Sequence, residues 1–277
     1  MKKVYAIPIY YTILRYKLGT HREGRTRLET IIDANIQLVH MSPIYLAGFV
    51  YMLIRNPSLY GFLLGLKLLL LSLIFYITTQ IIYEIGYLVN DNIAYFKEGK
   101  KGRNVFGEFL SIKEIIIYSV IRIFAFCVII VALAYLFSIY YISNYVIISL
   151  CLLIVFIVYN FTIPRNRAMY LFFPLRILKY TTMFYPLIHN VGLLMILPYI
   201  IGLSLEGTIT YALRKIPNDE IKLQKHLYQT YLQLLITTIV FYILFTLYGK
   251  LNYYFATVLL IVLISYVITL KLFRKVT

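Results

Sequence analysis

The chain has 277 residues, of which 61% are hydrophobic and only 14% are charged, and its mean hydropathy is +0.81. Several apolar runs exceed the roughly 20 residues needed to cross a bilayer. These values exclude a soluble globular domain and predict an all-α, polytopic integral membrane helical bundle. The two cysteines, Cys127 and Cys151, lie in apolar runs, so they indicate neither a disulfide framework nor a metal site, and both are expected in the core.

The net charge of +16 comes from Lys and Arg residues whose placement follows a membrane topology. Most of these 27 residues lie in clusters that alternate with apolar runs, at residues 2–27, 97–113, 165–179, 214–225 and 271–275. Because they form no continuous basic face, a nucleic-acid partner is not expected. The positive-inside rule places both termini in the cytoplasm, and the cytoplasmic membrane is the expected location.

The N-terminal part of the chain is basic and rich in tyrosine, and residues 1–26 are expected to form a cytoplasmic or interfacial segment. The first span is predicted at residues 27–54, with a kink at Pro43. Its cytoplasmic half carries Asp33, which is either a headgroup-level acid near the helix start or a residue that lines a cavity.

Three further spans are predicted at residues 58–89, 112–138 and 144–161. In the third span, Glu114, Tyr118 and Arg122 recur every four residues. Arg122 is the arginine that cannot easily reach water from its position. It is therefore expected to pair with an acid inside the bundle, and the candidates are Glu84 and Asp33.

Residues 168–206 are predicted to cross the membrane twice, because the basic clusters on either side both favour the cytoplasm. Each crossing is short and carries a proline, Pro174 or Pro198, which is typical of backbone that lines a cavity. The split is expected near residues 186–190. Two last spans, at residues 226–248 and 253–273, give a bundle of eight or nine spans, and residues 1–277 are expected to form a single integral membrane domain.

Polar residues follow one side of the second predicted span where it becomes less apolar. The members of this polar stripe are Gln80, Glu84, Tyr87, Asp91, Tyr95 and Glu98. Glu84 lies about two turns, roughly 10 Å, inside the point where the chain becomes polar. A carboxyl group at that depth needs a partner, a proton or a wet cavity. Two interpretations follow, a ligand site or a solvated helix end with ordinary juxtamembrane charge.

The run from Asn90 to Glu98, NDNIAYFKE, resembles the first motif of the UbiA superfamily of intramembrane prenyltransferases, N-D-x-x-D-x-x-x-D. Later residues are similar to family features in span order: Arg103 in a basic loop, residues 111–114 at the start of the third helix, and Tyr159, Asn160 and Arg165 after the fourth. The resemblance implies a UbiA-like fold, in which aspartates hold magnesium ions (Mg²⁺) that bind a prenyl diphosphate. A hydrophobic acceptor is then alkylated in a cavity open to the bilayer.

The sequence also departs from the family pattern. Ala94 stands where the motif has its second acid, and Glu98 replaces the third aspartate. The second acidic motif of the family is expected after the sixth span, where Glu206 is the nearest acid and Thr210 stands in place of another carboxylate. Asp219 and Glu220 are the next choice. Two full Asp motifs are therefore absent, and either the chemistry is reduced or the ligand has changed.

The resemblance assigns roles to individual residues. Asp91, Asn90 and Glu98 are the expected Mg²⁺ ligands, because Mg²⁺ prefers hard oxygen ligands and accepts few carboxylates. The expected catalytic residues are Asp91, Glu98, Glu84 and Arg103. The expected substrate-binding residues are Asn90, Lys97, Lys101, Arg165, Tyr87 and Tyr95. The bases would neutralise the diphosphate leaving group, and the tyrosines would stabilise the allylic cation.

The leading functional hypothesis is transfer of a prenyl or polyprenyl group from its diphosphate to a hydrophobic acceptor. The expected partners are the prenyl diphosphate, the acceptor and the surrounding membrane lipids. Gly-rich phosphate loops and the H-E-x-x-H motif are absent from the sequence. Two other classes stay open. One is a non-catalytic carrier in which Glu84, Arg122 and Asp33 form a proton- or substrate-coupled pathway. The other is a lipid-binding accessory protein that has kept the fold and lost the metal.

Overall fold

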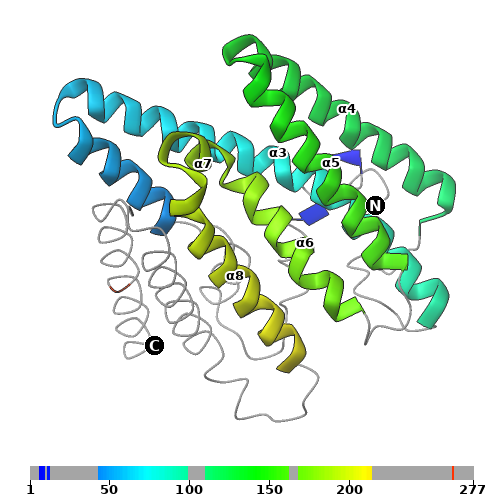
Figure 1. The fold of residues 1–277 in the computed structure, drawn as a ribbon. Helices are drawn as coiled ribbons and strands as arrows, with labels where there is room; N and C mark the ends of the chain where they lie inside the picture. The colour runs from blue at the N-terminus through cyan, green and yellow to red at the C-terminus, as the bar shows by residue number, and fades with distance from the viewer. Residues whose placement is uncertain are drawn as a thin grey trace, which may run out of the picture. The chain divides into compact units, whose positions relative to one another are not determined.

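The computed structural model describes residues 6–9, 11–12, 43–98, 110–161, 168–213 and 264. Its labelled helices are α3 (Leu59–Glu98), α4 (Ile112–Leu136), α5 (Ile139–Phe161), α6 (Ala168–Met183), α7 (Tyr185–Val191) and α8 (Leu193–Leu213). A shorter apolar helix, Pro43–Arg55, precedes α3 (Figure 1). These described residues contain no strand, which confirms the all-α prediction for this part of the chain.

Three of these helices are long and apolar enough to cross a membrane. The qualifying segments are Leu59–Asn92, Ile112–Leu136 and Tyr140–Phe161, with mean hydropathies of 2.1, 2.7 and 2.5. Their outer faces expose large apolar side chains, such as Phe124 (70% exposed) and Val131 (69%) on α4. Such faces suit a lipid environment, so the protein is a helical membrane protein.

The cysteines lie on these outer faces. Cys127 on α4 and Cys151 on α5 are both exposed, so the expectation that they belong to the core is wrong. The physical reason is that lipid tails are as apolar as a protein core. An apolar run in the sequence therefore does not reveal which of its positions face neighbouring helices.

The chain divides into two compact units. Unit 1 contains Met1–His40 and Ile74–Leu171, and unit 2 contains Met41–Leu73 and Phe172–Thr277. Helix α3 is continuous through the boundary between Leu73 and Ile74. A single integral membrane domain over residues 1–277 stays a prediction.

In unit 1, α4 and α5 form a hairpin whose turn is Phe137 and Ser138 (Figure 1). Helix α4 starts where it was predicted, because Ser111 and Glu114 form a capping box that satisfies the first backbone donors. Helix α5 starts at Ile139, earlier than the predicted residue 144, since two residues suffice for the turn.

Tyr145 of α5 joins the three helices of unit 1. Its ring lies 4.5 Å from that of Phe75 on α3 and 6.3 Å from that of Phe126 on α4, measured between centroids. Its hydroxyl also lies 3.2 Å from Oγ1 of Thr79 on α3. The second half of α3 is thereby packed against both helices of the hairpin.

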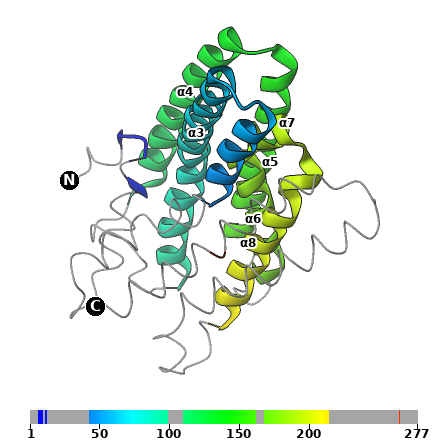
Figure 2. The same ribbon diagram turned by 90° about the vertical axis from the view of Figure 1, so that its left-hand side faces the viewer.

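In unit 2, the Pro43–Arg55 helix leads through residues 56–58 into the first half of α3, and α6 leads through α7 into α8 (Figure 2). The predicted split near residues 186–190 is occupied by the short helix α7. This helix tolerates Pro186 because the proline stands in its first turn, where its missing N–H is not needed. Gly192, at φ 109°, separates α7 from α8. Pro174 and Pro198 lie inside α6 and α8.

The other predicted spans lie largely outside the described residues. The first span is described only from Pro43 onward, and of residues 226–248 and 253–273 only Ile264 is described. The number of eight or nine spans, like the UbiA-like arrangement, therefore stays a prediction.

Candidate functional site

The polar stripe lies on a single unbroken helix. Helix α3 continues past the predicted end at residue 89 as far as Glu98, so the whole NDNIAYFKE motif is helical. Gln80, Glu84 and Asp91 are buried, and Tyr87 is partly buried. The backbone of residues 93–98 belongs to the same helix, while the side chains of Tyr95, Lys97 and Glu98 lie outside the described part.

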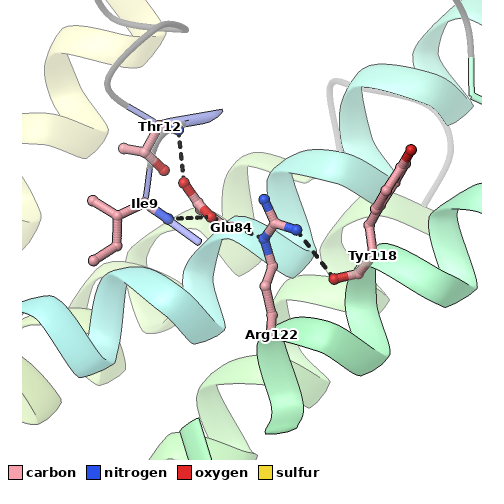
Figure 3. Close-up of polar contacts among 5 residues, drawn as sticks. All are labelled: Ile9, Thr12, Glu84, Tyr118 and Arg122. Atoms are coloured by element: carbon pink, nitrogen blue, oxygen red, sulfur yellow. Dashed lines mark hydrogen bonds and ion pairs between the residues drawn. The ribbon is translucent and has the colours of Figure 1, made fainter. Parts of the chain in front are cut away.

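Glu84 is the centre of the buried polar contacts in unit 1. Its Oε1 accepts a hydrogen bond from the backbone N–H of Thr12 at 2.7 Å. Its Oε2 accepts one from the backbone N–H of Ile9 at 2.8 Å and one from Nε of Arg122 at 2.8 Å. Figure 3 shows the carboxylate between the N-terminal residues and Arg122. Three donors compensate the cost of burying this charge.

Arg122 on α4 has an exposed fraction of 0%, as does Glu84, and the two form an ion pair. Nη1 of the same guanidinium donates to the backbone carbonyl of Tyr118 at 3.1 Å (Figure 3). The prediction that Arg122 pairs with an acid inside the bundle is confirmed, and the acid is Glu84. The other candidate, Asp33, lies outside the described residues.

The N-terminal residues Ile9, Tyr11 and Thr12, which we call the N-terminal contact residues, were not predicted to touch this stripe. Tyr11 and Thr12 are buried, with exposed fractions of 2% and 6%. Ile9 has a φ of 73°, a left-handed conformation that typically costs a non-glycine residue about 1–3 kcal/mol. Its N–H reaches Glu84 from this strained backbone. The sequence carried no periodic or motif signal for the contact.

Asp91 lies two turns after Glu84 and is 4% exposed. Its Oδ2 accepts a short hydrogen bond from the hydroxyl of Tyr11, and its Oδ1 accepts one from Nδ2 of Asn90 at 3.2 Å. The side-chain amide of Asn90 thereby holds the carboxylate of Asp91 in one orientation. A buried carboxylate that accepts a hydrogen bond on each oxygen does not fit the interpretation of a solvated helix end.

Asn92, which was not assigned a role, connects α3 to the residues that lead into α4. Its Nδ2 donates to the carbonyl of Leu88 at 2.7 Å, and its Oδ1 accepts from the backbone N–H of Leu110 at 2.9 Å. Leu110 packs with Tyr11 and Leu88 in one buried cluster. The amide therefore holds the start of the α4 segment against the same turn of α3 that carries Asp91.

A cluster of three aromatic side chains lies beside the polar stripe. The ring of Tyr87 is 4.9 Å from that of Tyr83 and 5.6 Å from that of Phe156 on α5, between centroids. Phe156 approaches α3 closely because Gly86 has no side chain, and Nδ2 of Asn160 donates to the carbonyl of Gly86 at 2.9 Å. Asn160 thus contacts the backbone of α3, a role that sequence reasoning did not assign to it.

The described side chains do not by themselves form a magnesium site. They contain no group of three or more His, Cys, Asp or Glu residues that could hold a metal ion. Of the expected ligands, Asp91 already accepts hydrogen bonds on both oxygens, and Asn90 directs its amide nitrogen at Asp91. Glu98 is described only as backbone. A magnesium site at this position therefore stays a prediction that rests on the resemblance.

Several predicted site residues lie outside the described part of the chain: Lys101, Arg103, Arg165, Asp219 and Glu220. Thr210 is described only as backbone. Their assignments stay predictions.

Glu206, the nearest acid to the missing second motif, lies in unit 2 on α8. Its Oε2 is 3.4 Å from Nη2 of Arg176 on α6, which also donates to the hydroxyl of Tyr180 and to the carbonyl of Leu203, each at 2.7 Å. The guanidinium lies against Gly207, where a Cβ would meet Cζ of Arg176 at 1.7 Å. Sequence reasoning counted Arg176 only as a juxtamembrane base, although its spacing of four from Tyr180 was a usable signal.

No protein-family model, curated protein or solved structure matches this chain.

Proposed function

We propose that this protein is a UbiA-like membrane prenyltransferase that binds a prenyl diphosphate at the polar end of α3 and transfers the prenyl group to a hydrophobic acceptor. The observation that carries the proposal is Asp91, a carboxylate 4% exposed at the end of a long apolar helix. A buried carboxylate in that position is costly, and an ionisable residue that a membrane helix carries at such a cost supports a functional site. Its neighbours, Asn90 and Asn92, are polar and ordered by hydrogen bonds.

The chemistry of the neighbouring residues supports a prenyl cation. Loss of diphosphate from a prenyl diphosphate leaves an allylic cation, and aromatic faces stabilise cations. Tyr83 and Tyr87 lie about two turns and one turn before Asp91 on α3, and Phe156 of α5 packs against both rings. In the proposal, Lys97, Lys101, Arg103 and Arg165 neutralise the diphosphate, as the resemblance implies. Mg²⁺ enters the proposal only through the resemblance.

The contacts of Glu84 disfavour the alternative of a carrier. A proton- or substrate-coupled pathway requires Glu84 and Arg122 to exchange partners during transport. Glu84 instead accepts from three donors of the protein itself, and both residues are completely buried. We therefore assign this pair to the stability of unit 1. The topology that belongs to the proposal has eight spans, with both termini at the cytoplasmic face of the cytoplasmic membrane.

The proposal is tested with the full chain in nanodiscs, titrated with geranyl, farnesyl and geranylgeranyl diphosphate with and without Mg²⁺. Asp91→Asn keeps the shape of the side chain and removes its charge. We expect at least a tenfold loss of Mg²⁺-dependent affinity, about 1.4 kcal/mol, with little loss of folding. Glu114→Gln, a charge-matched change at the cap of α4, should bind as the natural chain does. Unchanged affinity in Asp91→Asn contradicts the proposal and favours an accessory protein.

Two further variants test how much other positions of the same site contribute to ligand affinity. Glu98→Gln should weaken binding less than Asp91→Asn, since water can replace a carboxylate ligand at the end of the helix. Ala94→Asp should strengthen it, because residue 94 follows Asp91 by three positions and precedes Glu98 by four on the same helix. Release of inorganic diphosphate in the presence of membrane lipid extract then separates turnover from simple binding.

A further inference from the structure

The contacts of the N-terminal contact residues, Ile9, Tyr11 and Thr12, fall on both buried acids of the stripe. The backbone N–H groups of Ile9 and Thr12 donate to Glu84, and the hydroxyl of Tyr11 donates to Asp91. Glu84 and Asp91 are seven residues, about 10 Å, apart along α3. The N-terminal part of the chain is thus attached to the stripe at two points.

The two attachments differ in strength and in exchangeability. At Glu84 the backbone donors share the carboxylate with Arg122, so this attachment belongs to the buried ion pair. At Asp91 the phenolic hydroxyl of Tyr11 donates to Oδ2, and a cation or hydrogen-bond donor that binds Asp91 can replace this contact. The backbone of Ile9, which donates to Glu84, is strained at a φ of 73°, and release of the segment would relieve this strain.

The geometry points to a closing device. We infer that the N-terminal contact residues cover Asp91 in the ligand-free protein, with the Tyr11 hydroxyl as the releasable contact, and that ligand binding at Asp91 displaces Tyr11. That the ligand is a prenyl diphosphate rests on the proposed function, and because the diphosphate is an anion, it would have to reach Asp91 through a cation such as Mg²⁺. The cover itself rests only on the contacts of Tyr11, Ile9 and Thr12 with α3.

Amide hydrogen exchange of the full chain in nanodiscs tests the cover without any ligand. In the natural chain, the peptide that contains Ile9 and Thr12 should exchange slowly, because both N–H groups are bonded to a buried carboxylate. Tyr11→Phe keeps the ring and removes the hydroxyl, so exchange in this peptide should rise about tenfold while α4 and α5 stay protected. Tyr135→Phe, at an exposed position of α4, is the matched control and should change nothing.

Ile9→Gly gives an effect of opposite sign, because glycine adopts a φ of 73° without strain. Exchange of the Thr12 amide should become slower in this variant. If the peptide that contains Ile9 and Thr12 exchanges in Tyr11→Phe as slowly as in the natural chain, the inference is wrong. Faster exchange throughout α3, α4 and α5 in Tyr11→Phe also overturns it, because Tyr11 would then be a general packing residue.

A second arm adds farnesyl diphosphate and Mg²⁺ and separates this inference from the proposed function. Binding accompanied by faster exchange at Ile9 and Thr12, and tightened about tenfold by Tyr11→Phe, supports both. Binding that leaves this peptide protected overturns the displacement and leaves the proposed function standing. If no diphosphate binds to the natural chain or to Tyr11→Phe, the proposed function fails, and the ligand-free arm alone decides whether the cover exists.

Discussion

The Nε atom of Arg122 on α4 donates to Oε2 of Glu84 on α3 across 2.8 Å, and neither side chain has any exposed surface. Removing one member of such a pair leaves an uncompensated buried charge, which typically costs about 3–5 kcal/mol. We expect Glu84→Gln and Arg122→Gln each to lower the free energy of unfolding by about this amount, and the double variant to lose much less than the sum. Reversible unfolding in mixed detergent micelles measures all three.

A second cycle provides the control for this prediction. Glu114 lies at the cap of α4 and bonds to Ser111, so Glu114→Gln and Arg122→Gln should lose stability additively. Additive losses in the Glu84 and Arg122 cycle as well would mean that the ion pair contributes no coupling energy.

The close approach of α3 and α5 predicts the effect of Gly86→Ala. A Cβ at this position would lie 2.0 Å from Cδ1 of Phe156, so one of the two helices must shift. We expect a loss of about 1–3 kcal/mol in the free energy of unfolding, as for other overpacked sites. Phe156→Leu in the same chain should recover part of the loss. In Gly192→Ala, where the cost comes from a φ of 109°, Phe156→Leu should recover nothing.

The contacts of Arg176 in unit 2 predict that lysine cannot replace arginine at this position without a loss of stability. Its Nη2 donates to the hydroxyl of Tyr180 and the carbonyl of Leu203, and its guanidinium lies 5.2 Å from the ring centroid of Tyr180. Lysine keeps the charge but loses the planar group, so Arg176→Lys should cost about 1.5–3 kcal/mol. The melting temperature in detergent reports this loss. Lys67→Arg, at an exposed position of α3, is the control, and an equal effect of both changes would contradict the prediction.

The clustered bases predict the orientation of the helices. In a chain with Cys127 and Cys151 replaced by serine, Asn56→Cys, Ser138→Cys and Asn252→Cys should react with an impermeant maleimide from outside the cell. Residue 138 is chosen because the turn between α4 and α5 lies there. Gly102→Cys and Asn218→Cys should react only after the membrane is opened. If Gly102→Cys is labelled from outside, the predicted orientation is wrong, and the polar end of α3 does not face the cytoplasm.

The sequence by itself determined the class of protein and the position of its long helices. Length and hydropathy are local properties, so the spans that became α3, α4 and α5 were predicted with starts and ends mostly within a few residues. The need of Arg122 for an acid was also readable, because the cost of an unpaired charge in a bilayer does not depend on the details of the fold.

Only the tertiary structure decided which acid pairs with Arg122, which apolar faces meet lipid, and what covers Asp91. The hydroxyl of Tyr11 reaches a carboxylate 80 residues later in the chain, and the N–H of Ile9 reaches one 75 residues later. No local pattern encodes such contacts, because they depend on how distant segments pack. In a membrane protein the core and the lipid-facing surface are equally apolar, so packing alone placed Cys127 and Cys151 on the outside and Tyr11 within unit 1.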